Sequence, residues 1–240
     1  MTRQDVDRMV RAEPGAVAER YARRQVGDRY NIVNADVWQT MQERQRAMLR
    51  LFARHLGGRE LSTMSLCEVG CGGGGNLLEL LRAGFSPERL SGLELLPERA
   101  AAARRVLPLA LSVFEGDALQ APLIPASQDI VFQSVVFSSL LDDSFQQRLA
   151  ERMWSWVRPG GAVLWYDFIY NNPSNRDVRG VPVRRVRELF PQARMTLRRV
   201  TLAPPIARRV CRIHPAAYSL FNSLPLLRSH VLCWLHKAPQ

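Results

Sequence analysis

The sequence predicts an α/β fold in which a mostly parallel β-sheet carries helices on both faces. From residue 65 onward, short apolar segments alternate with segments of helical periodicity, which is typical of strands joined by helical crossovers. A glycine cluster at 70–75 directly follows the first of these strands and precedes a helix, and doubly wound sheets bind their ligands at such a point. A length of 240 residues suits one domain of this kind.

The first 60 residues are predicted to form a helical lid and a first helix, ahead of a single domain at 61–240. The clearest helix in this region covers 37–55, because its apolar side chains recur at three- and four-residue steps. Gly57 and Gly58 follow it and provide a helix stop.

Seven apolar segments, several of them bounded by glycine or proline, predict the strands of the sheet. These segments cover 65–71, 89–95, 111–117, 129–136, 162–168, 193–202 and 229–237. The helices predicted between them cover 76–84, 97–107, 144–157, 181–190 and 206–224, the last of which is interrupted by Pro215.

The net charge of +11 is concentrated in one part of the chain and is carried by arginine, because Lys237 is the only lysine. Between residues 176 and 212, eleven arginines stand against two acids. Such a patch can attract nucleic acid, an anionic membrane surface or a phosphorylated substrate. A solvated surface without a partner is the equally open alternative.

The cysteines and the N-terminus predict a cytoplasmic protein with reduced thiols and no metal. Cys67, Cys71, Cys211 and Cys233 are too few for a disulfide scaffold, and the spacing of the first two is not that of a zinc site. The first residues lack the apolar stretch of a signal peptide, and no apolar run reaches the length of a membrane-spanning helix.

The glycine loop at 70–75 carries the most information about ligand chemistry. Five of its six residues are glycine, which permits positive φ and a close approach of a ligand to the main chain. The loop lacks the Gly-Lys-Ser or Gly-Lys-Thr ending of a Walker loop. Its spacing also fits a dinucleotide fingerprint, but Glu68 would repel bound phosphates. A carboxylate at that position suits a cationic ligand, such as an ammonium or sulfonium group.

These residues resemble the class I S-adenosylmethionine-dependent methyltransferases, and the chain is similar to bacterial members of the small-molecule type. The first motif of that family, an acid followed by alternating glycines, is matched by Glu68, Gly70, Gly72 and Gly74. Four later markers follow in order, namely Glu94, Gly116-Asp117-Ala118, Asp129-Ile130-Val131 and Arg158-Pro159-Gly160-Gly161. The resemblance covers about residues 65–168.

The resemblance implies a Rossmann-like seven-stranded sheet with an antiparallel last strand, and S-adenosyl-L-methionine as the methyl donor. It implies that Glu94 binds both ribose hydroxyls and that Asp117 lies near the adenine amino group. Amides of the glycine loop and the helix after it can take the carboxylate of the cofactor. The expected cofactor-binding residues are Glu68, Gly70, Cys71, Gly72, Gly74, Asn76, Glu94, Leu95, Asp117, Ala118, Gln133 and Ser134.

The sequence predicts the acceptor-binding residues less specifically than the cofactor-binding residues. The end of the fourth strand lacks the Asn-Pro-Pro-Tyr and Pro-Cys sequences of several nucleic-acid methyltransferases, which argues against base methylation. Asp167, Tyr166 and His214 are the catalytic candidates; for Asp167 and His214, a structural role is the alternative. The expected substrate-binding residues are Tyr30, Phe137, Asp142, Tyr170, Asn171 and Arg176.

The leading functional hypothesis is methyl transfer to a small-molecule or glycan acceptor, favoured at oxygen, with an anionic acceptor suggested by the arginines. One alternative is a lipid-linked or phosphorylated acceptor at a membrane surface, with peripheral membrane contact. Another is a nucleic-acid-binding methyltransferase, which is disfavoured because no aromatic residues are interleaved with the arginines.

Overall fold

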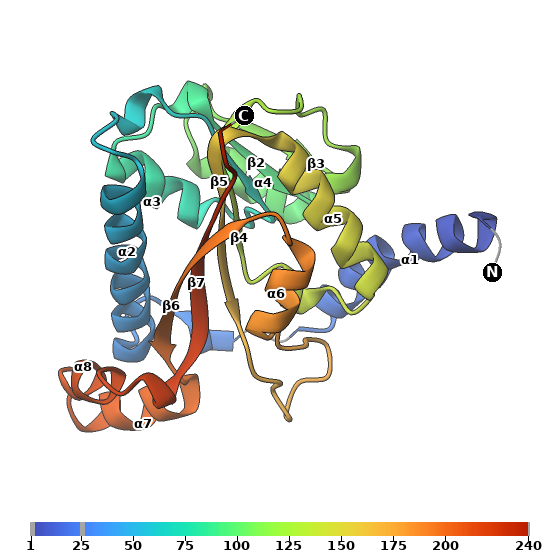
Figure 1. The fold of residues 1–240 in the computed structure, drawn as a ribbon. Coiled ribbons are helices and arrows are strands. Elements are labelled where there is room, and N and C mark those ends of the chain that lie inside the picture. The colour runs from blue at the N-terminus through green and yellow to red at the C-terminus, as the bar shows by residue number, and fades with distance from the viewer. Residues whose placement is uncertain (1–2, 25–26, 240) are drawn as a thin grey trace.

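The computed structural model describes residues 3–24 and 27–239 and contains one seven-stranded sheet (Figure 1). The strand order is β3-β2-β1-β4-β5-β7-β6. Neighbours from β3 to β5 pair in parallel, and β7 pairs antiparallel with both β5 and β6. The strands are β1 Leu66–Val69, β2 Leu90–Glu94, β3 Ser112–Glu115, β4 Gln128–Ser134, β5 Val157–Phe168, β6 Arg194–Leu202 and β7 Arg228–His236. The predicted topology, including the antiparallel last strand, is confirmed.

Helices cover both faces of this sheet, with α2 and α3 on one side and α5 and α6 on the other (Figure 1). The helices are α1 Arg3–Ala22, α2 Ala35–His55, α3 Gly75–Ala83, α4 Pro97–Val106, α5 Asp143–Trp156, α6 Val183–Leu189, α7 Pro204–Ile213 and α8 Ala217–Asn222. None of the helices in the described residues is long and apolar enough to cross a membrane.

Two apolar cores form because each strand alternates its side chains between the two faces. On β5, Trp165 packs toward α5 and α6 with Phe190, whereas Leu164 packs toward α2 and α3 with Trp234. All four side chains are buried. This rigid sheet fixes the positions of the loops at its carboxyl edge, where the candidate site lies.

Two element boundaries differ from the prediction. The sequence predicts a strand over 162–168, whereas β5 begins at Val157. A register shift lets Val157 pair with Gln128 ahead of the main ladder, so the Arg-Pro-Gly-Gly sequence lies inside the strand. The helix predicted over 206–224 is two helices, α7 and α8, with Pro215 between them. Proline lacks the backbone donor that a continuous helix needs there.

Candidate active site

The glycine loop connects β1 to α3 at the carboxyl edge of the sheet. The backbone N–H groups of Gly70 and Cys71 both donate to the Leu93 carbonyl at 2.7 and 3.0 Å, which ties the loop to the end of β2. Gly70 has φ +69°, and a Cβ atom there would lie 2.5 Å from Cγ2 of Val136. Only glycine fits this position, because any side chain would be strained and would collide with the loop after β4.

Glu68 lies beneath the loop and is fully buried. Its Oε1 accepts a hydrogen bond of 2.5 Å from Nδ2 of Asn76, while its Oε2 has no partner among the described residues. Burial raises the pKa of Glu68 to about 8. A buried carboxylate oxygen without a partner is costly, so the site is suited to a ligand that brings a cationic donor to this oxygen.

Arg44 from α2 completes this polar group. Its guanidinium donates to Oδ1 of Asn76 at 2.6 Å and pairs with Glu79 at 3.3 Å. It also lies 5.4 Å from the ring centroid of Tyr166. Arg44 is not among the residues predicted from the sequence. Arg44 lies three residues after Met41 and four before Met48, so it is on the apolar stripe of the predicted helix. An arginine at such a position indicates a buried polar contact.

Glu94 ends β2 and is buried beside the glycine loop. Its Oε2 accepts from the Gly72 backbone N–H at 2.7 Å, and its Oε1 accepts from the Leu96 N–H at 3.0 Å. Each carboxylate oxygen can accept a second hydrogen bond. Glu94 therefore braces the loop and keeps the acceptor capacity that ribose hydroxyls require.

Asp117 lies one strand further along the same edge. Its Oδ1 accepts from the Leu119 N–H at 2.9 Å and caps the short helix that follows β3. A hollow of ≈510 Å³ borders Asp117 and is also lined by Leu93, Phe114 and Gly116. Leu95 and Ala118 are half-buried on the same side. These positions suit the adenosine part of the expected cofactor.

Arg99 is a second site residue that is not predicted from the sequence. A Cβ atom on Gly72 would come within 2.5 Å of its Nη2, so the guanidinium lies against the glycine loop. It also lies 5.1 Å from the ring centroid of Tyr21 in α1. In the sequence, Arg99 is one of many arginines, and only its place in the first turn after the strand of Glu94 sets it apart.

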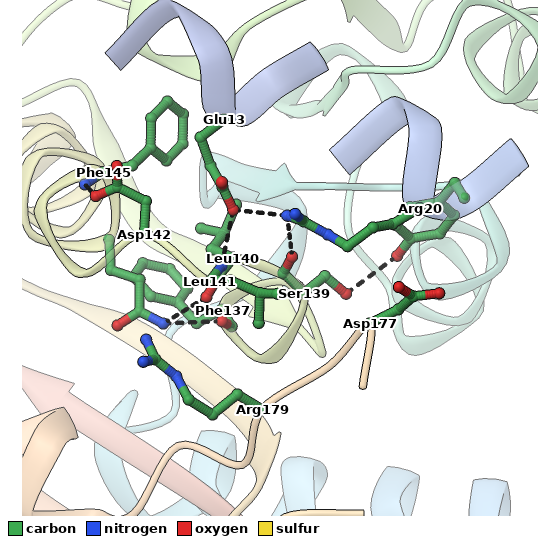
Figure 2. A network of polar contacts seen from close by, with 12 residues as sticks. Glu13, Arg20, Phe137, Ser139, Leu140, Leu141, Asp142, Phe145, Asp177 and Arg179 are labelled. Carbon is green, nitrogen blue, oxygen red and sulfur yellow. Dashed lines mark hydrogen bonds and ion pairs between the residues drawn. The ribbon is translucent and has the colours of Figure 1, made fainter. Parts of the chain in front are cut away.

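Helix α1 is fixed over the loop between β4 and α5, as Figure 2 shows. Glu13 and Arg20 form a buried ion pair of 2.6 Å. Arg20 donates to the Ser139 carbonyl at 3.0 Å, and Glu13 accepts from the Leu141 N–H at 2.7 Å. Helix α1 therefore covers part of the carboxyl edge, and its Glu13–Arg20 ion pair holds it against the backbone of the β4–α5 loop.

The end of β4 lies beside the glycine loop, because Gln133 is in register with Val69 of β1. Gln133 is fully buried; its side chain donates to the Tyr166 carbonyl at 3.3 Å and accepts from the Val136 N–H at 3.1 Å. Ser134 is half-buried and accepts from Arg44 at 3.3 Å. Gln133 thus shapes the strand end, and Ser134 joins the polar group around Arg44.

The three catalytic candidates do not lie together. Asp167 is fully buried; its Oδ2 accepts from the Ser138 N–H at 3.1 Å and its Oδ1 from the Phe168 N–H at 2.9 Å. Burial raises the pKa of Asp167 to about 7. Tyr166 points to the opposite face of β5, and exposed His214 accepts from the Ala216 N–H at 3.1 Å after α7.

Tyr166 belongs to a packed cluster of residues from β5, β6 and β7. Its hydroxyl lies 2.8 Å from Oγ1 of Thr201 on β6. Its ring stacks on His230 of β7 at a centroid distance of 5.0 Å. Thr201 has φ +64°, a strained conformation for a β-branched residue. These contacts join strands distant in the sequence, so no local pattern marks them.

Two expected substrate-binding residues have internal roles. Phe137 is fully buried and its ring lies 4.5 Å from that of Trp165, so it has no surface for an acceptor. Asp142 caps α5 by accepting from the Ser144 and Phe145 N–H groups at 2.7 and 2.9 Å. Both residues therefore shape the loop between β4 and α5.

The other expected substrate-binding residues are on the surface. Tyr30 and Arg176 are exposed. Tyr170, also exposed, accepts a hydrogen bond from Arg199 at 3.3 Å. Asn171 accepts from the Gly180 N–H at 3.0 Å and so closes the loop after β5. Three of these four residues belong to that loop, which leaves the sheet at its carboxyl edge.

Comparisons with known proteins agree with this arrangement. Residues 66–161 match the model of the methyltransferase domain family. An S-adenosylmethionine-dependent methyltransferase from Mesorhizobium loti has the same fold, with 16% identity, a TM-score of 0.58, and coverage of 81% of this chain and 96% of that one. No curated protein sequence matches the chain.

Two further solved structures share the fold at low identity. Geranyl diphosphate C-methyltransferase from Streptomyces coelicolor A3(2) is 14% identical, with a TM-score of 0.58 over 79% of this chain and 77% of that one. Phosphoethanolamine N-methyltransferase 2 from Haemonchus contortus, in complex with S-adenosyl-L-methionine, is 16% identical, with a TM-score of 0.59 over 82% of this chain and 52% of that one.

The residues at the carboxyl edge fit the cofactor that this family uses. The unpartnered oxygen of Glu68 suits a cation, Glu94 has free acceptor capacity, and Gly70 leaves no room for a side chain. Together with the strand order and the match of residues 66–161 to the methyltransferase domain family, these features identify an S-adenosylmethionine-dependent methyltransferase with S-adenosyl-L-methionine as its methyl donor.

Proposed function

We propose that this methyltransferase acts on a small-molecule or glycan acceptor, at oxygen, and that the acceptor carries an anionic group. The position of α1 carries the proposal. Through Glu13 and Arg20, α1 is fixed on Ser139 and Leu141 at the carboxyl edge. A site covered in this way suits a compact acceptor better than a nucleic-acid duplex.

The charge of the acceptor side supports the anionic group. The loop after β5 carries exposed Arg176, and Arg179 in the same loop is ion-paired with Asp143. Arg176 has no ion-pair partner among the described residues. The neighbours from Streptomyces and Haemonchus are named for geranyl diphosphate and phosphoethanolamine, and both compounds carry phosphate.

The cofactor supplies a methyl group on a sulfonium, which is already activated, so alignment of the acceptor accounts for much of the catalysis. Glu68 would hold the cationic part of the cofactor and Glu94 its ribose, and Asp117 would border the adenine. Asp167 remains the base that we propose, because a pKa of about 7 is in the useful range for proton transfer. Asp167 is fully buried and Ser138 of the β4–α5 loop donates to it, so this loop must move before an acceptor can reach Asp167.

The test is a transfer assay with isotopically labelled S-adenosyl-L-methionine and three acceptor pools. The pools are hydroxylated and phosphorylated small molecules, lipids in vesicles, and nucleic acids. We expect label in the first pool. Label confined to nucleic acid would contradict the proposal, and label confined to the vesicles would support the lipid-linked alternative.

With an active acceptor in hand, Arg176→Ala tests the anionic group. We expect a higher KM for the acceptor and unchanged affinity for S-adenosylhomocysteine. Arg194→Ala is the matched control, because Arg194 is also exposed but begins β6 at the opposite edge of the sheet. Equal KM values for the two variants would remove Arg176 from the acceptor site.

A further inference from the structure

Exposed apolar side chains gather at one end of the molecule. Of the fourteen large apolar residues that are exposed in the described part of the chain, eight lie in the short segments 30–33 and 213–226. We call the six most exposed aliphatic members of this group the docking face. They are Ile32, Val33, Ile213, Leu220, Leu224 and Leu226, with exposed fractions of 51, 77, 84, 70, 54 and 86%.

The two segments belong to one surface. Ala35, at the start of α2, packs into the small core of α7 and α8. Gln39 donates to the Pro215 carbonyl at 3.1 Å, which holds the first turns of α2 against the link between α7 and α8. Segment 30–33 directly precedes this contact. In Figure 1, α7 and α8 lie at the end toward which the β5 and β6 arrows point, which is the end of the candidate site.

These apolar residues are not needed for the core beneath them. Helix α7 already buries Ala207, Val210 and Cys211 against Tyr218 of α8. The docking face lies outside this core. Exposed apolar side chains gathered on neighbouring segments in this way mark a site of contact with a partner or a membrane.

Positive charge outweighs negative charge around the docking face, although Asp28 and Asp36 flank segment 30–33. Arg209 and Arg212 are exposed on α7, and the sequence contains no aspartate or glutamate after Glu188. Behind α8, a hollow of ≈370 Å³ opens between α2 and β6, and we call it the arginine hollow. Its charged lining residues are one acid, Glu43, and five arginines, namely Arg46, Arg50, Arg198, Arg199 and Arg228. None of the five forms an ion pair with another described residue.

We propose that the docking face and the arginine hollow bind the surface of an anionic phospholipid bilayer. Exposed aliphatic side chains flanked by arginines are the chemistry of an interfacial membrane anchor, in which the apolar residues enter the acyl boundary and the cations meet the headgroups. The carboxyl edge of the sheet, where the candidate site lies, would then face the bilayer. The proposal concerns binding alone and holds whether or not the acceptor is a lipid.

Charge and residue type disfavour other occupants. A second copy of the chain would bring the five arginines of the hollow against another five, and Glu43 is the one acid among the lining residues. Single-stranded nucleic acid is usually held by aromatic side chains that stack on the bases, whereas the docking face is aliphatic. An anionic bilayer satisfies both the apolar and the charged parts of the surface.

The experiment is vesicle flotation of the full chain without cofactor or acceptor, so its result is independent of catalysis. The vesicles are phosphatidylcholine alone, and phosphatidylcholine mixed with phosphatidylglycerol. We expect binding to the mixed vesicles that weakens with salt, because arginines near a charged leaflet are screened. Absence of binding to the mixed vesicles at low salt would overturn the proposal.

Paired variants separate the apolar contribution to membrane binding from the contribution of the arginines. Ile213→Ser with Leu226→Ser should lower partition at least about tenfold, because two inserted side chains return to water. The matched control is Leu109→Ser with Ile124→Ser, two exposed residues that precede β3 and β4 at the other edge of the sheet.

Arg209→Gln with Arg212→Gln should lower partition about 25-fold, from about fivefold per arginine. Arg82→Gln with Arg89→Gln, at exposed positions before β2, is its control.

Two results would contradict the assignment of this surface. Loss of flotation in the control variants, to the same extent, would show that any exposed apolar or cationic residue suffices. Sedimentation of a dimer that dissociates in the Ile213 and Leu226 variant would identify a second copy of the chain as the occupant. Far-ultraviolet circular dichroism of each variant verifies that it is folded.

Discussion

The cofactor side and the acceptor side of this sheet are built in different ways. On the cofactor side, β1, β2 and β4 end in contacts made largely by the main chain: Gly70 donates to the Leu93 carbonyl and Gly72 donates to Glu94. On the acceptor side, side chains from distant segments meet, as Tyr166 does with Thr201 and His230. The first kind of site depends on local backbone geometry, whereas the second depends on how whole elements pack.

The largest expected effect tests whether the cofactor side is fixed by its backbone. Gly70→Ala should lower the free energy of unfolding by about 2–5 kcal/mol, because strain at positive φ and a contact with Val136 add together. Gly73→Ala is the matched control: its Cβ would meet nothing within 4 Å and its φ is not positive. We expect a change under about 0.5 kcal/mol there.

Urea denaturation of both variants measures this difference, and calorimetry with S-adenosylhomocysteine measures its effect on the ligand. Equal stability of the Gly70 and Gly73 variants would mean that the loop adapts to a side chain. The cofactor side would then not depend on local backbone geometry in the way that distinguishes it from the acceptor side.

The next effect concerns the acid at the end of β2. Glu94→Ala should weaken binding of S-adenosylhomocysteine about tenfold or more, since a hydrogen bond to a charged group is worth about 1.5–3 kcal/mol. It also leaves the Gly72 and Leu96 N–H groups without their acceptor. Calorimetric titration is the measurement.

Glu88 provides a control for Glu94. It is an exposed acid in the short helix Pro87–Arg89, at the opposite end of β2 from Glu94. Glu88→Ala should leave the affinity unchanged. If both substitutions behave alike, Glu94 is only a strand-end acid.

The pH dependence of stability compares a buried acid from each half. Burial raises the pKa of Glu68 to about 8 and that of Asp167 to about 7. Between their ordinary pKa values near 4 and these values, the folded state binds more protons than the unfolded state. The free energy of unfolding contributed by these groups is therefore greatest at low pH and is lost as the pH rises toward 8.

Urea midpoints between pH 5 and 8 measure this slope. Glu68→Gln and Asp167→Asn should each flatten it, because an amide does not titrate. Saturating S-adenosylhomocysteine should flatten the Glu68 contribution, since its ammonium group favours the carboxylate. An unchanged slope in Glu68→Gln would show that Glu68 is ionised throughout.

The sequence predicts the features that depend on local backbone geometry better than those that depend on contacts between separate elements. The spacing of Glu68 and the glycines specifies a strand, a turn and a helix within ten residues, so the fold and the position of the loop are predicted from local signals. The sequence also predicts that the last strand is antiparallel, through the family resemblance. Asn76 was expected at the cofactor, and the structure supplies the detail that it links Glu68 to Arg44.

The rest could not be predicted because it depends on separate elements meeting. Arg44 and Asn76 are 32 residues apart, and Tyr166 and Thr201 are 35 apart. Asp167 is buried, and the backbone N–H groups of Ser138 and Phe168 satisfy its carboxylate there. No periodicity in the sequence distinguishes a buried carboxylate of this kind from an exposed one at the end of a strand.

The smallest effect tests whether Tyr166, an expected catalytic residue, acts through structure. Tyr166→Phe removes the hydroxyl that lies 2.8 Å from Oγ1 of buried Thr201. The free energy of unfolding should fall by about 1 kcal/mol, the usual net worth of one hydrogen bond. The ring and its stacking on His230 remain, so the affinity for S-adenosylhomocysteine and kcat should be unchanged. Tyr30→Phe, at an exposed hydroxyl, is the control for stability and should show no loss. A large fall in kcat with full stability would instead make Tyr166 a catalytic residue, because a hydroxyl that only joins β5 to β6 cannot affect turnover without affecting folding.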